Sequence, residues 1–339
     1  MKIALLLYGQ PRFFQYTYKH ILEEYTIKNC ETHIFAHFWK DIGFGPSDDE
    51  TNTYYNIDNL EELLNNINTK KYLIEDYTNL DKALIYIKEQ INKDHNRYKI
   101  GQHLSMEKCF NLIEQYQSEH NIKYDIVIKV RTDIIYKNKK FYNTHTEYEN
   151  IKYNNYIKPF ENFEKKTNNC LILPYTVHEI PEQLLNNSKY QEAKESNELI
   201  NIHCNTDSKI LQLLNKIKPE NMYNFKHIYV AIGSDIYNIA DYNTARMIYK
   251  DWVQKYINLY KKNSHLSIYK HFYRRLHTLY NFFLIEKKVN IHGTLCKNRY
   301  RRLVYSKSCK EKFIRCPKKK SIVINDFNQL NDEYIFNFK

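Results

Sequence analysis

Short runs of consecutive apolar residues alternate along the chain with longer segments whose apolar residues recur at helical spacing. The runs at Ile3–Leu7, Tyr124–Val130 and Ile228–Ile232 are typical of strands buried on both faces. Further strands are predicted at 32–39, 71–75, 170–173, 289–292 and 300–305. Helices are predicted at 13–25, 59–67, 80–92, 105–120, 207–217, 244–260 and 267–287. The alternation predicts an α/β fold, with a mostly parallel sheet flanked by helices.

Some local features refine this pattern. In the helix at 105–120, an apolar stripe is formed by Met106, Cys109, Phe110, Ile113 and Tyr116. The polar, Asn-rich residues 137–169 predict an irregular insertion. Pro174 is expected to close the strand at 170–173, because proline has no N–H for a strand ladder.

Composition excludes several classes of protein. The 339 residues include only 6 Gly, and they form neither a Gly-x-Gly-x-x-Gly loop nor a P-loop, which argues against both nucleotide-binding motifs. The 7 Cys are odd in number and contain no Cys-x-x-Cys pair, so a reduced, cytoplasmic setting is expected. No apolar run is long enough for a transmembrane helix, and residues 1–10 are interpreted as a strand rather than a signal peptide.

Positive charge is concentrated near one end of the chain. Residues 297–320 hold 11 Lys and Arg against Glu311 alone, which accounts for most of the formal net charge of +12. Such a block can bind a diphosphate, a nucleic acid or an anionic membrane surface, or it can be a solvated tail. The segment 299–302 is interleaved with apolar residues and is therefore expected to be part of an ordered strand.

Three predicted strands end in residues that can carry chemistry. After the first strand come Gly9, whose backbone a ligand can approach closely, Gln10, whose amide can pair with a base edge, and Arg12, which can bind phosphate. Because ligands of open α/β sheets bind at the carboxyl ends of strands, these positions are candidate binding residues. The alternative is a tight turn in which the arginine caps a neighbouring acid.

The other two strand ends carry carboxylates. Arg131-Thr132-Asp133 follows the strand at 124–130, and Asp133 could bind Mg²⁺ or Mn²⁺ bridging a nucleotide diphosphate. The alternative is an Arg131–Asp133 ion pair that braces the sheet edge. Asp235 follows the strand at 228–232 and could act as a general base, or it could be a helix N-cap.

Two histidines share one face of the strand at 32–39. His33 and His37 are four residues apart, with no third metal ligand near them in the sequence. His37 lies near the end of the strand, where it either lines the cleft or is a hydrogen-bonded core residue.

Taken in order, the motifs resemble those of predicted glycosyltransferases with a GT-A-like fold from bacterial polysaccharide clusters and large DNA viruses. The resemblance rests mainly on Gly9-Gln10-Pro11-Arg12 and on the Tyr-Asp…Arg-x-Asp segment at Tyr124–Asp133. Weaker matches are the segments Thr32–Trp39, Asp235–Tyr249 and Tyr300–Val304. The similarity covers roughly residues 1–305, which are expected to form the GT-A-like domain, and 306–339 are expected to be a basic C-terminal extension.

The resemblance implies transfer of a hexose from a UDP- or GDP-sugar to a hydroxyl of a glycan or protein acceptor. It implies that the donor is bound by Tyr8, Gly9, Gln10, Arg12, Arg131 and Arg302. It also implies that Asp133 holds a catalytic Mn²⁺ or Mg²⁺ and that Asp235 is the base or orienting residue on the acceptor side. Arg131 stands where the family usually has an acid, which weakens the expected affinity for a divalent cation. The alternative function is a nucleic-acid- or anionic-surface-binding protein that uses the basic segment.

Overall fold

The computed structural model of the chain describes eleven ranges of residues. They are 1–11, 14–40, 59–92, 97–136, 145–161, 170–179, 228–232, 237–263, 290–295, 300–305 and 321–324. The strands are β1 (Lys2–Gly9), β2 (Glu31–Trp39), β3 (Thr69–Glu75), β4 (Ile126–Arg131), β5 (Ile134–Tyr136), β6 (Cys170–Glu179), β7 (Ile228–Ile232), β8 (Tyr237–Asp241), β9 (Asn290–Leu295), β10 (Tyr300–Tyr305) and β11 (Ser321–Ile324). The helices are α1 (Phe14–Tyr25), α2 (Leu60–Asn66), α3 (Thr78–Ile91), α4 (Arg97–His120), α5 (His145–Tyr156), α6 (Lys158–Glu161), α11 (Tyr242–Tyr249) and α12 (Trp252–Asn263).

The described strands form one large sheet and one small sheet. The large sheet has the order β3-β2-β1-β4-β8-β6-β7, with β9 paired to β6. The first four strands are parallel, and β8 and β7 run against the others. The small sheet has the order β11-β10-β5. The prediction of an α/β fold with a mostly parallel sheet flanked by helices is confirmed.

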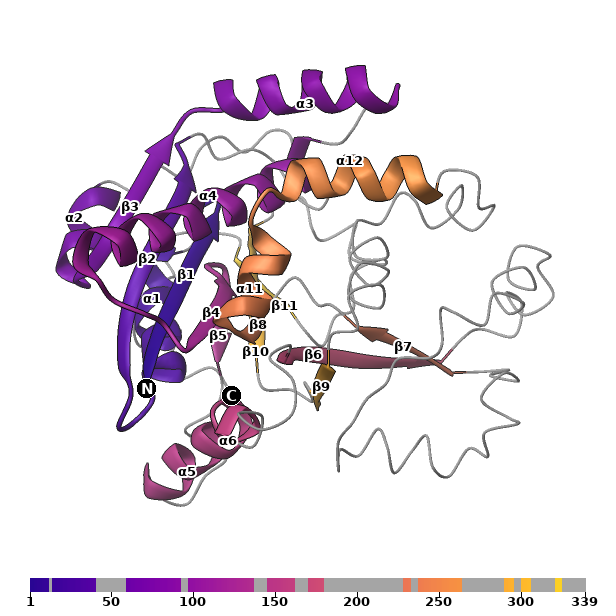
Figure 1. Cartoon of the computed structure of the whole chain (residues 1–339). Coiled ribbons are helices and arrows are strands. Elements are labelled where there is room, and N and C mark those ends of the chain that lie inside the picture. The colour runs from indigo at the N-terminus through magenta and orange to yellow at the C-terminus, as the bar shows by residue number, and fades with distance from the viewer. Residues whose placement is uncertain are drawn as a thin grey trace.

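The central strand β1 is buried on both faces because helices cover both. Alternate side chains of a strand point to opposite faces. Ala4, Leu6 and Tyr8 pack in the cluster that includes α4, and Ile3, Leu5 and Leu7 pack in the cluster that includes α1. Figure 1 shows the two helices on opposite sides of the strand. The predicted stripe of α4 supplies the fully buried side chains of Cys109, Phe110 and Ile113. The continuous apolar run at the start of the chain therefore marks the middle of the core.

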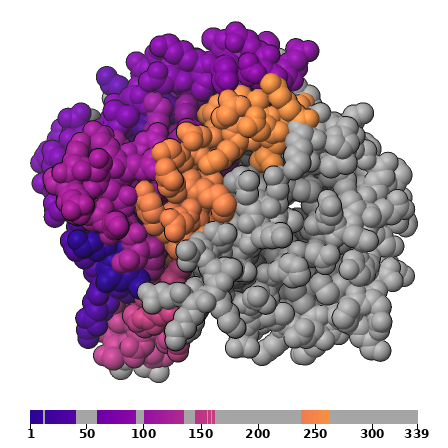
Figure 2. Space-filling model, viewed as in Figure 1, coloured from indigo at the N-terminus to yellow at the C-terminus, as the bar shows by residue number. Residues whose placement is uncertain are grey.

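Helices α11 and α12 extend the core on the α4 side. They pack against α4, and α12 also against α3, and both are visible as an orange band beside the purple helices in Figure 2. The single helix predicted at 244–260 is wrong in one respect, because the chain breaks between α11 and α12 at Asp251, which has a φ of 51°. None of the described helices combines the length and the apolarity needed to cross a membrane.

The irregular insertion predicted at 137–169 is wrong where the structure describes it, since α5 and α6 lie there. Tertiary contacts stabilise α5 although its apolar pattern is weak. The buried Glu24 of α1 accepts hydrogen bonds from the hydroxyls of Tyr148 (2.6 Å) and Tyr156 (2.5 Å). Lys152 Nζ donates to the carbonyl oxygens of Glu23 and Thr26, at 2.8 Å each, at the end of α1. The two tyrosines lie 124 and 132 residues from Glu24 along the chain, so the local sequence pattern around α5 does not reveal these hydrogen bonds.

Two strands also differ from expectation. The strand predicted to close at Pro174 continues to Glu179, because Pro174 falls between the segment of β6 that pairs with β8 and the segment that pairs with β7. Strand β8, which lies beside β4, was not expected, since its five residues carry no clear apolar run. The predicted helices at 207–217 and 267–287 lie outside the described residues.

We expect Leu6→Ala to lower the free energy of unfolding by about 2–5 kcal/mol, because Leu6 is fully buried in the middle of the sheet. The matched control is Ile85→Ala, at a side chain that is 59% exposed on α3, with an expected change within about 0.5 kcal/mol. Urea denaturation measures both. Equal effects of the two substitutions would contradict the described core.

Candidate functional site

The strand order reverses between β1 and β4. From β1 the chain proceeds to β2 and β3 on one side, whereas β4 pairs with the opposite edge of β1. In open α/β sheets, ligands bind beyond the carboxyl ends of the strands at such a switch point. The register places Tyr8 of β1 beside Arg131 of β4 at this edge.

The turn after β1 is held from three directions. Gly9 has a φ of 100°, a conformation that strains any residue with a Cβ. Its N–H donates to Ser105 Oγ of α4 at 2.7 Å. The carbonyl of Gln10 accepts from Thr132 Oγ1 at 3.0 Å, and its side-chain amide donates to Tyr77 Oη at 2.7 Å. Both strand ends and α4 therefore fix the backbone that follows β1.

Beyond β4, Arg131 and Asp133 form a bidentate ion pair. Arg131 Nε donates to Asp133 Oδ1 at 2.8 Å, and Nη2 donates to Oδ2 at 2.7 Å. The Asp133 side chain is 3% exposed and that of Arg131 is 15% exposed. Two parallel hydrogen bonds fix the plane of the guanidinium as well as its position. The ion pair that the sequence left as an alternative is therefore present, at the switch point.

This pairing bears on the expected metal ion. Both carboxylate oxygens of Asp133 accept hydrogen bonds from a cation, so a divalent metal would have to displace Arg131 or bind beside its positive charge. Within the described ranges, no group of three His, Cys, Asp or Glu side chains is arranged to hold a metal ion. The described residues of this edge do not fit Mn²⁺ or Mg²⁺.

A second positively charged side chain near this edge, Lys129, was not among the residues predicted from the sequence. Lys129, in the middle of β4, is 5% exposed and its Nζ lies 5.1 Å from the centre of the Tyr8 ring. Tyr8 Oη in turn accepts from Gln102 Nε2 of α4 at 3.3 Å. A lysine within an otherwise apolar strand was the available signal, since lysine is almost never buried without a partner.

Strand β10 of the small sheet lies beside β5, the strand that follows Asp133. β5 begins directly after Asp133, and β10 pairs with it antiparallel, so that Arg302 stands opposite Ile134. The ordered strand expected around 299–302 is confirmed for Tyr300–Tyr305. The register pairs Arg302 with the residue that follows Asp133, and the role of Arg302 in binding the donor stays a prediction. Most of the basic segment 297–320 lies outside the described residues, and the nucleic-acid alternative stays a prediction.

Two predicted site residues, Arg12 and Asp235, lie outside the described residues, so their convergence with Asp133 stays a prediction. The alternative interpretation of Asp235 as a helix N-cap also stays a prediction, and the next described element along the chain is strand β8. The N-cap of α11 is Asp241, whose carboxylate accepts from the Thr244 N–H at 2.9 Å.

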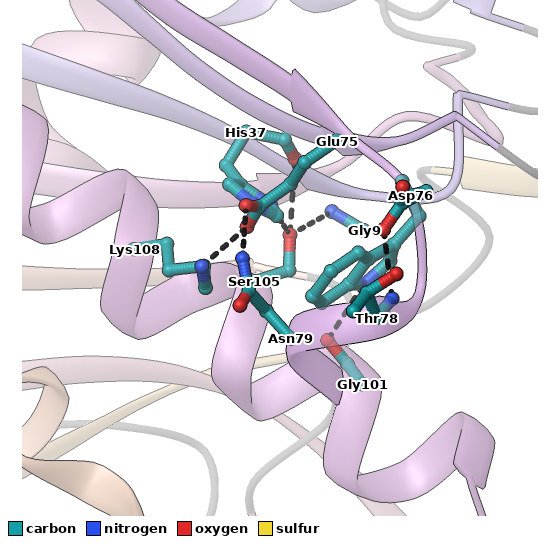
Figure 3. A network of polar contacts seen from close by, with 10 residues as sticks. Gly9, His37, Glu75, Asp76, Thr78, Asn79, Gly101, Ser105 and Lys108 are labelled. Carbon is teal, nitrogen blue, oxygen red and sulfur yellow. Dashed lines mark hydrogen bonds and ion pairs between the residues drawn. The ribbon is translucent and has the colours of Figure 1, made fainter. Parts of the chain in front are cut away.

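A buried polar network joins the ends of β1, β2 and β3 beneath the switch point (Figure 3). His37 of β2 contacts Ser105 Oγ through Nδ1 at 2.7 Å and Glu75 Oε1 through Nε2 at 2.8 Å. Glu75 also accepts from Asn79 Nδ2 at 2.9 Å and is ion-paired with Lys108. Because His37 is fully buried, the interpretation of it as a hydrogen-bonded core histidine is confirmed, and the interpretation as a cleft residue is wrong.

Ser105, His37 and Glu75 contact one another in the same order as the serine, histidine and acid of a hydrolase triad, but here the serine is buried rather than open to a substrate. Ser105 has no exposed surface, and its oxygen already accepts the Gly9 N–H. A nucleophile must reach a reacting atom of the substrate. Ser105 therefore serves the structure around Gly9 rather than covalent catalysis.

The pKa values of both titratable groups of the network are lowered, for different reasons. Burial lowers the pKa of His37, and the Glu75 contact only partly offsets this, so the imidazole is neutral. Burial alone would raise the pKa of Glu75. Hydrogen bonds from His37, Lys108 and Asn79 outweigh that effect and lower the pKa to about 2. The carboxylate is thus the charged member of the network.

Comparisons with known proteins were made for the chain and for its structure. No family model matches, and no curated protein matches the sequence. Solved structures similar to this chain include mouse xyloside xylosyltransferase 1, with 11% identity, a TM-score of 0.40, and coverage of 98% of this chain and 100% of that one. Core-mannan synthase A from Aspergillus fumigatus, in an Mn/GDP form, has 13% identity, a TM-score of 0.36, and coverage of 86% and 72%.

A third similar structure is a nucleoside-diphosphate-sugar pyrophosphorylase from Vibrio cholerae RC9. It has 10% identity and a TM-score of 0.33, with coverage of 88% of this chain and 94% of that one. Since all three TM-scores are below 0.5, the likeness carries no functional inference for this chain.

We expect the stability of the protein to fall as the pH falls below 6.5, and again below 4.5. His37 takes up a proton near its ordinary pKa of 6.5 only when unfolded, because its folded pKa is lower. Glu75 is protonated near 4.5 when unfolded but only at about 2 when folded, so its contribution is present above 4.5 and is lost towards pH 2. Urea denaturation across this range measures both windows.

Two variants separate these contributions. His37→Gln should flatten the pH dependence that begins at 6.5, and Glu75→Gln should flatten that between 4.5 and 2. If the stability curves of wild type and both variants run parallel at all pH values, the described protonation states are wrong.

Proposed function

We propose that this chain is a nucleotide-sugar-dependent glycosyltransferase whose donor diphosphate binds at the switch point between β1 and β4. The observation that carries the proposal is the convergence there of the Gly9–Gln10 turn with Arg131. The topology supports it because a mostly parallel sheet with this reversal binds ligands at that edge. The sequence motifs that resemble those of GT-A-like glycosyltransferases fall on the same two strand ends.

The charges at this edge suit a diphosphate. Arg131 is fixed by Asp133 before any ligand arrives, so little rotational freedom is lost when it binds an anion. Lys129 adds positive charge from within the strand, and the backbone pairing of Arg302 with Ile134 supports a contribution from Arg302 as well. In surroundings that exclude water, such cations stabilise negative charge more strongly than they would in bulk water.

The proposed reaction has one bond-forming and one bond-breaking event. The oxygen of an acceptor hydroxyl forms a bond to the anomeric carbon of the sugar. The bond from that carbon to the diphosphate oxygen breaks, and its electron pair leaves on the nucleoside diphosphate. Arg131 stabilises the charge that develops on this leaving group.

The proton of the acceptor hydroxyl needs a base. We assign this role to Asp235, which follows β7 and precedes β8 in the sequence. Asp133 positions Arg131 in this scheme, and no step depends on a bound metal ion. The donor is a UDP- or GDP-hexose and the acceptor a glycan or protein hydroxyl. The cytoplasmic setting and the bacterial or viral origin remain expectations from the sequence.

We expect a nucleoside diphosphate to stabilise the protein, and a chelator not to abolish the effect. At about 100 times Kd, a ligand that binds only the folded state adds about 2.7 kcal/mol. Thermal unfolding with UDP, GDP and their sugars, each with Mn²⁺ and with chelator, measures this. If no nucleotide raises the unfolding temperature, the proposed function is wrong; if only the chelator-free samples respond, the metal-independent binding is wrong.

Variants of the ion pair identify which member binds the donor. Asp133→Asn keeps a side-chain oxygen that can accept from Arg131 and should retain nucleotide binding at reduced affinity, whereas the double variant Arg131→Gln/Asp133→Asn should lose it. The double variant avoids leaving a buried carboxylate without its cation, a change that alone costs about 3–5 kcal/mol. The control is Arg246→Gln, which breaks an ion pair with Glu114 between α11 and α4. Loss of binding in Asp133→Asn with retention in the double variant would contradict the assignment.

A further inference from the structure

Ser105 connects the ends of β1 and β2 directly, and the end of β3 through His37. Its hydroxyl oxygen accepts the N–H of Gly9 at 2.7 Å and lies 2.7 Å from His37 Nδ1. The same hydroxyl donates to the carbonyl oxygen of His37 at 3.0 Å. One hydroxyl on α4 therefore contacts the last residue of β1 and a residue near the end of β2.

The carboxylate of Glu75 determines which nitrogen of a neutral His37 imidazole carries the proton. The Glu75 carboxylate can only accept, so His37 carries its proton on Nε2. His37 Nδ1 is then an acceptor, and it shares the single hydroxyl proton of Ser105 with the carbonyl oxygen of His37. The oxygen of Ser105 presents its lone pairs to the N–H of Gly9. Each hydrogen bond thus points from β1 towards the carboxylate at the end of β3.

The carboxylate is itself held in place. Glu75 accepts from Asn79 Nδ2 and pairs with Lys108 of α4, and its side chain is 16% exposed. A fixed charge selects the tautomer of the histidine, and the tautomer selects the direction of the serine hydroxyl. The position of Gly9 is therefore linked to a charged group on another strand by three hydrogen bonds.

We propose that His37 and Ser105 are positioning residues, which set the Gly9–Gln10 turn in the geometry that receives the donor diphosphate. This inference rests on the proposed function for the identity of the ligand. It extends that function to two buried residues that never touch the donor. It also explains why the strand that carries His37 needs a polar residue in an otherwise apolar, fully buried position.

The chain contains a matched control on the same strand. His33 is also buried and makes the same pair of contacts, through Nδ1 to Tyr124 Oη at 2.7 Å and through Nε2 to Glu31 Oε1 at 2.8 Å. The register places His33 beside Ala4, far from the strand end, whereas His37 stands beside Tyr8. Substitution of either histidine removes two side-chain hydrogen bonds, but only His37 is connected to Gly9.

The first experiment needs no ligand. Amide hydrogen exchange, followed by NMR on the wild-type protein and on Ser105→Ala, reports the protection of the Gly9 N–H directly. We expect exchange at Gly9 to become at least about tenfold faster in the variant, corresponding to one lost hydrogen bond, while Leu5 keeps its protection. Unchanged exchange at Gly9 would overturn the positioning role.

The second experiment measures the affinity for UDP and GDP by calorimetry in three histidine variants. His37→Asn can still accept the serine proton through its side-chain oxygen and should retain affinity. His37→Gln should weaken binding by about tenfold, and His33→Gln should leave it unchanged although both glutamine variants lower the unfolding temperature. Equal loss of affinity in the two glutamine variants would overturn the proposal, because the effect would then follow from stability alone.

The two experiments fail in different ways. If the wild-type protein binds neither nucleotide, the proposed function is wrong and the donor-binding part of this inference is wrong with it. The exchange rate of Gly9 decides the positioning role in either case.

Discussion

The N–H of Gly9 is a hydrogen-bond donor at the end of a strand that both α1 and α4 cover. A buried backbone donor must be paired, and here the partner is the hydroxyl of Ser105 on α4. That requirement fixes the end of β1 to the helix, and through His37 it fixes the ends of β2 and β3 as well. The left-handed φ of Gly9 then directs the chain towards Thr132 at the end of β4. The geometry of the candidate site follows from the need to satisfy this donor.

The ion pair of Arg131 and Asp133 determines how that site can handle an anion. A carboxylate whose oxygens both accept from a guanidinium is a weak ligand for a divalent cation, since the cation would meet a positive charge beside it. The same carboxylate makes the arginine a well-oriented binding group. In this account, fixed side-chain cations replace the metal ion that the sequence resemblance implied, and Lys129 adds to them from inside β4.

The parts of the fold that could be predicted from the sequence are those with a strong local signal. The apolar runs of β1 and β4 and the stripe of α4 are visible without any partner, and they lead to the correct strand ends. Strand β8 could not be predicted, because its pairing with β4 stabilises five residues that have little pattern of their own. Helix α5 could not be predicted either, since its stability depends on Glu24 more than 100 residues away.

The candidate site also contains residues that stand out in the sequence and residues that only the fold brings together. Gly9, Gln10 and Asp133 stand out in the sequence because they follow predicted strands, and their ligand-binding roles stay predictions. Ser105 and Glu75 do not stand out, since each is an unremarkable polar residue until the fold brings it to His37, 68 and 38 residues away along the chain. A buried hydrogen-bond network has no sequence period, so only the structure shows it.

The most direct test of the central claim is to follow backbone amide signals by two-dimensional ¹H–¹⁵N NMR while UDP or GDP is added in the presence of a chelator. The account predicts that the signals of Gly9, Gln10 and Thr132 shift with nucleotide, and that Ile3 and Asp125 at the opposite end of the strands do not. Shifts confined to the amino ends of β1 and β4, or no shift at Gly9 and Thr132, would contradict it.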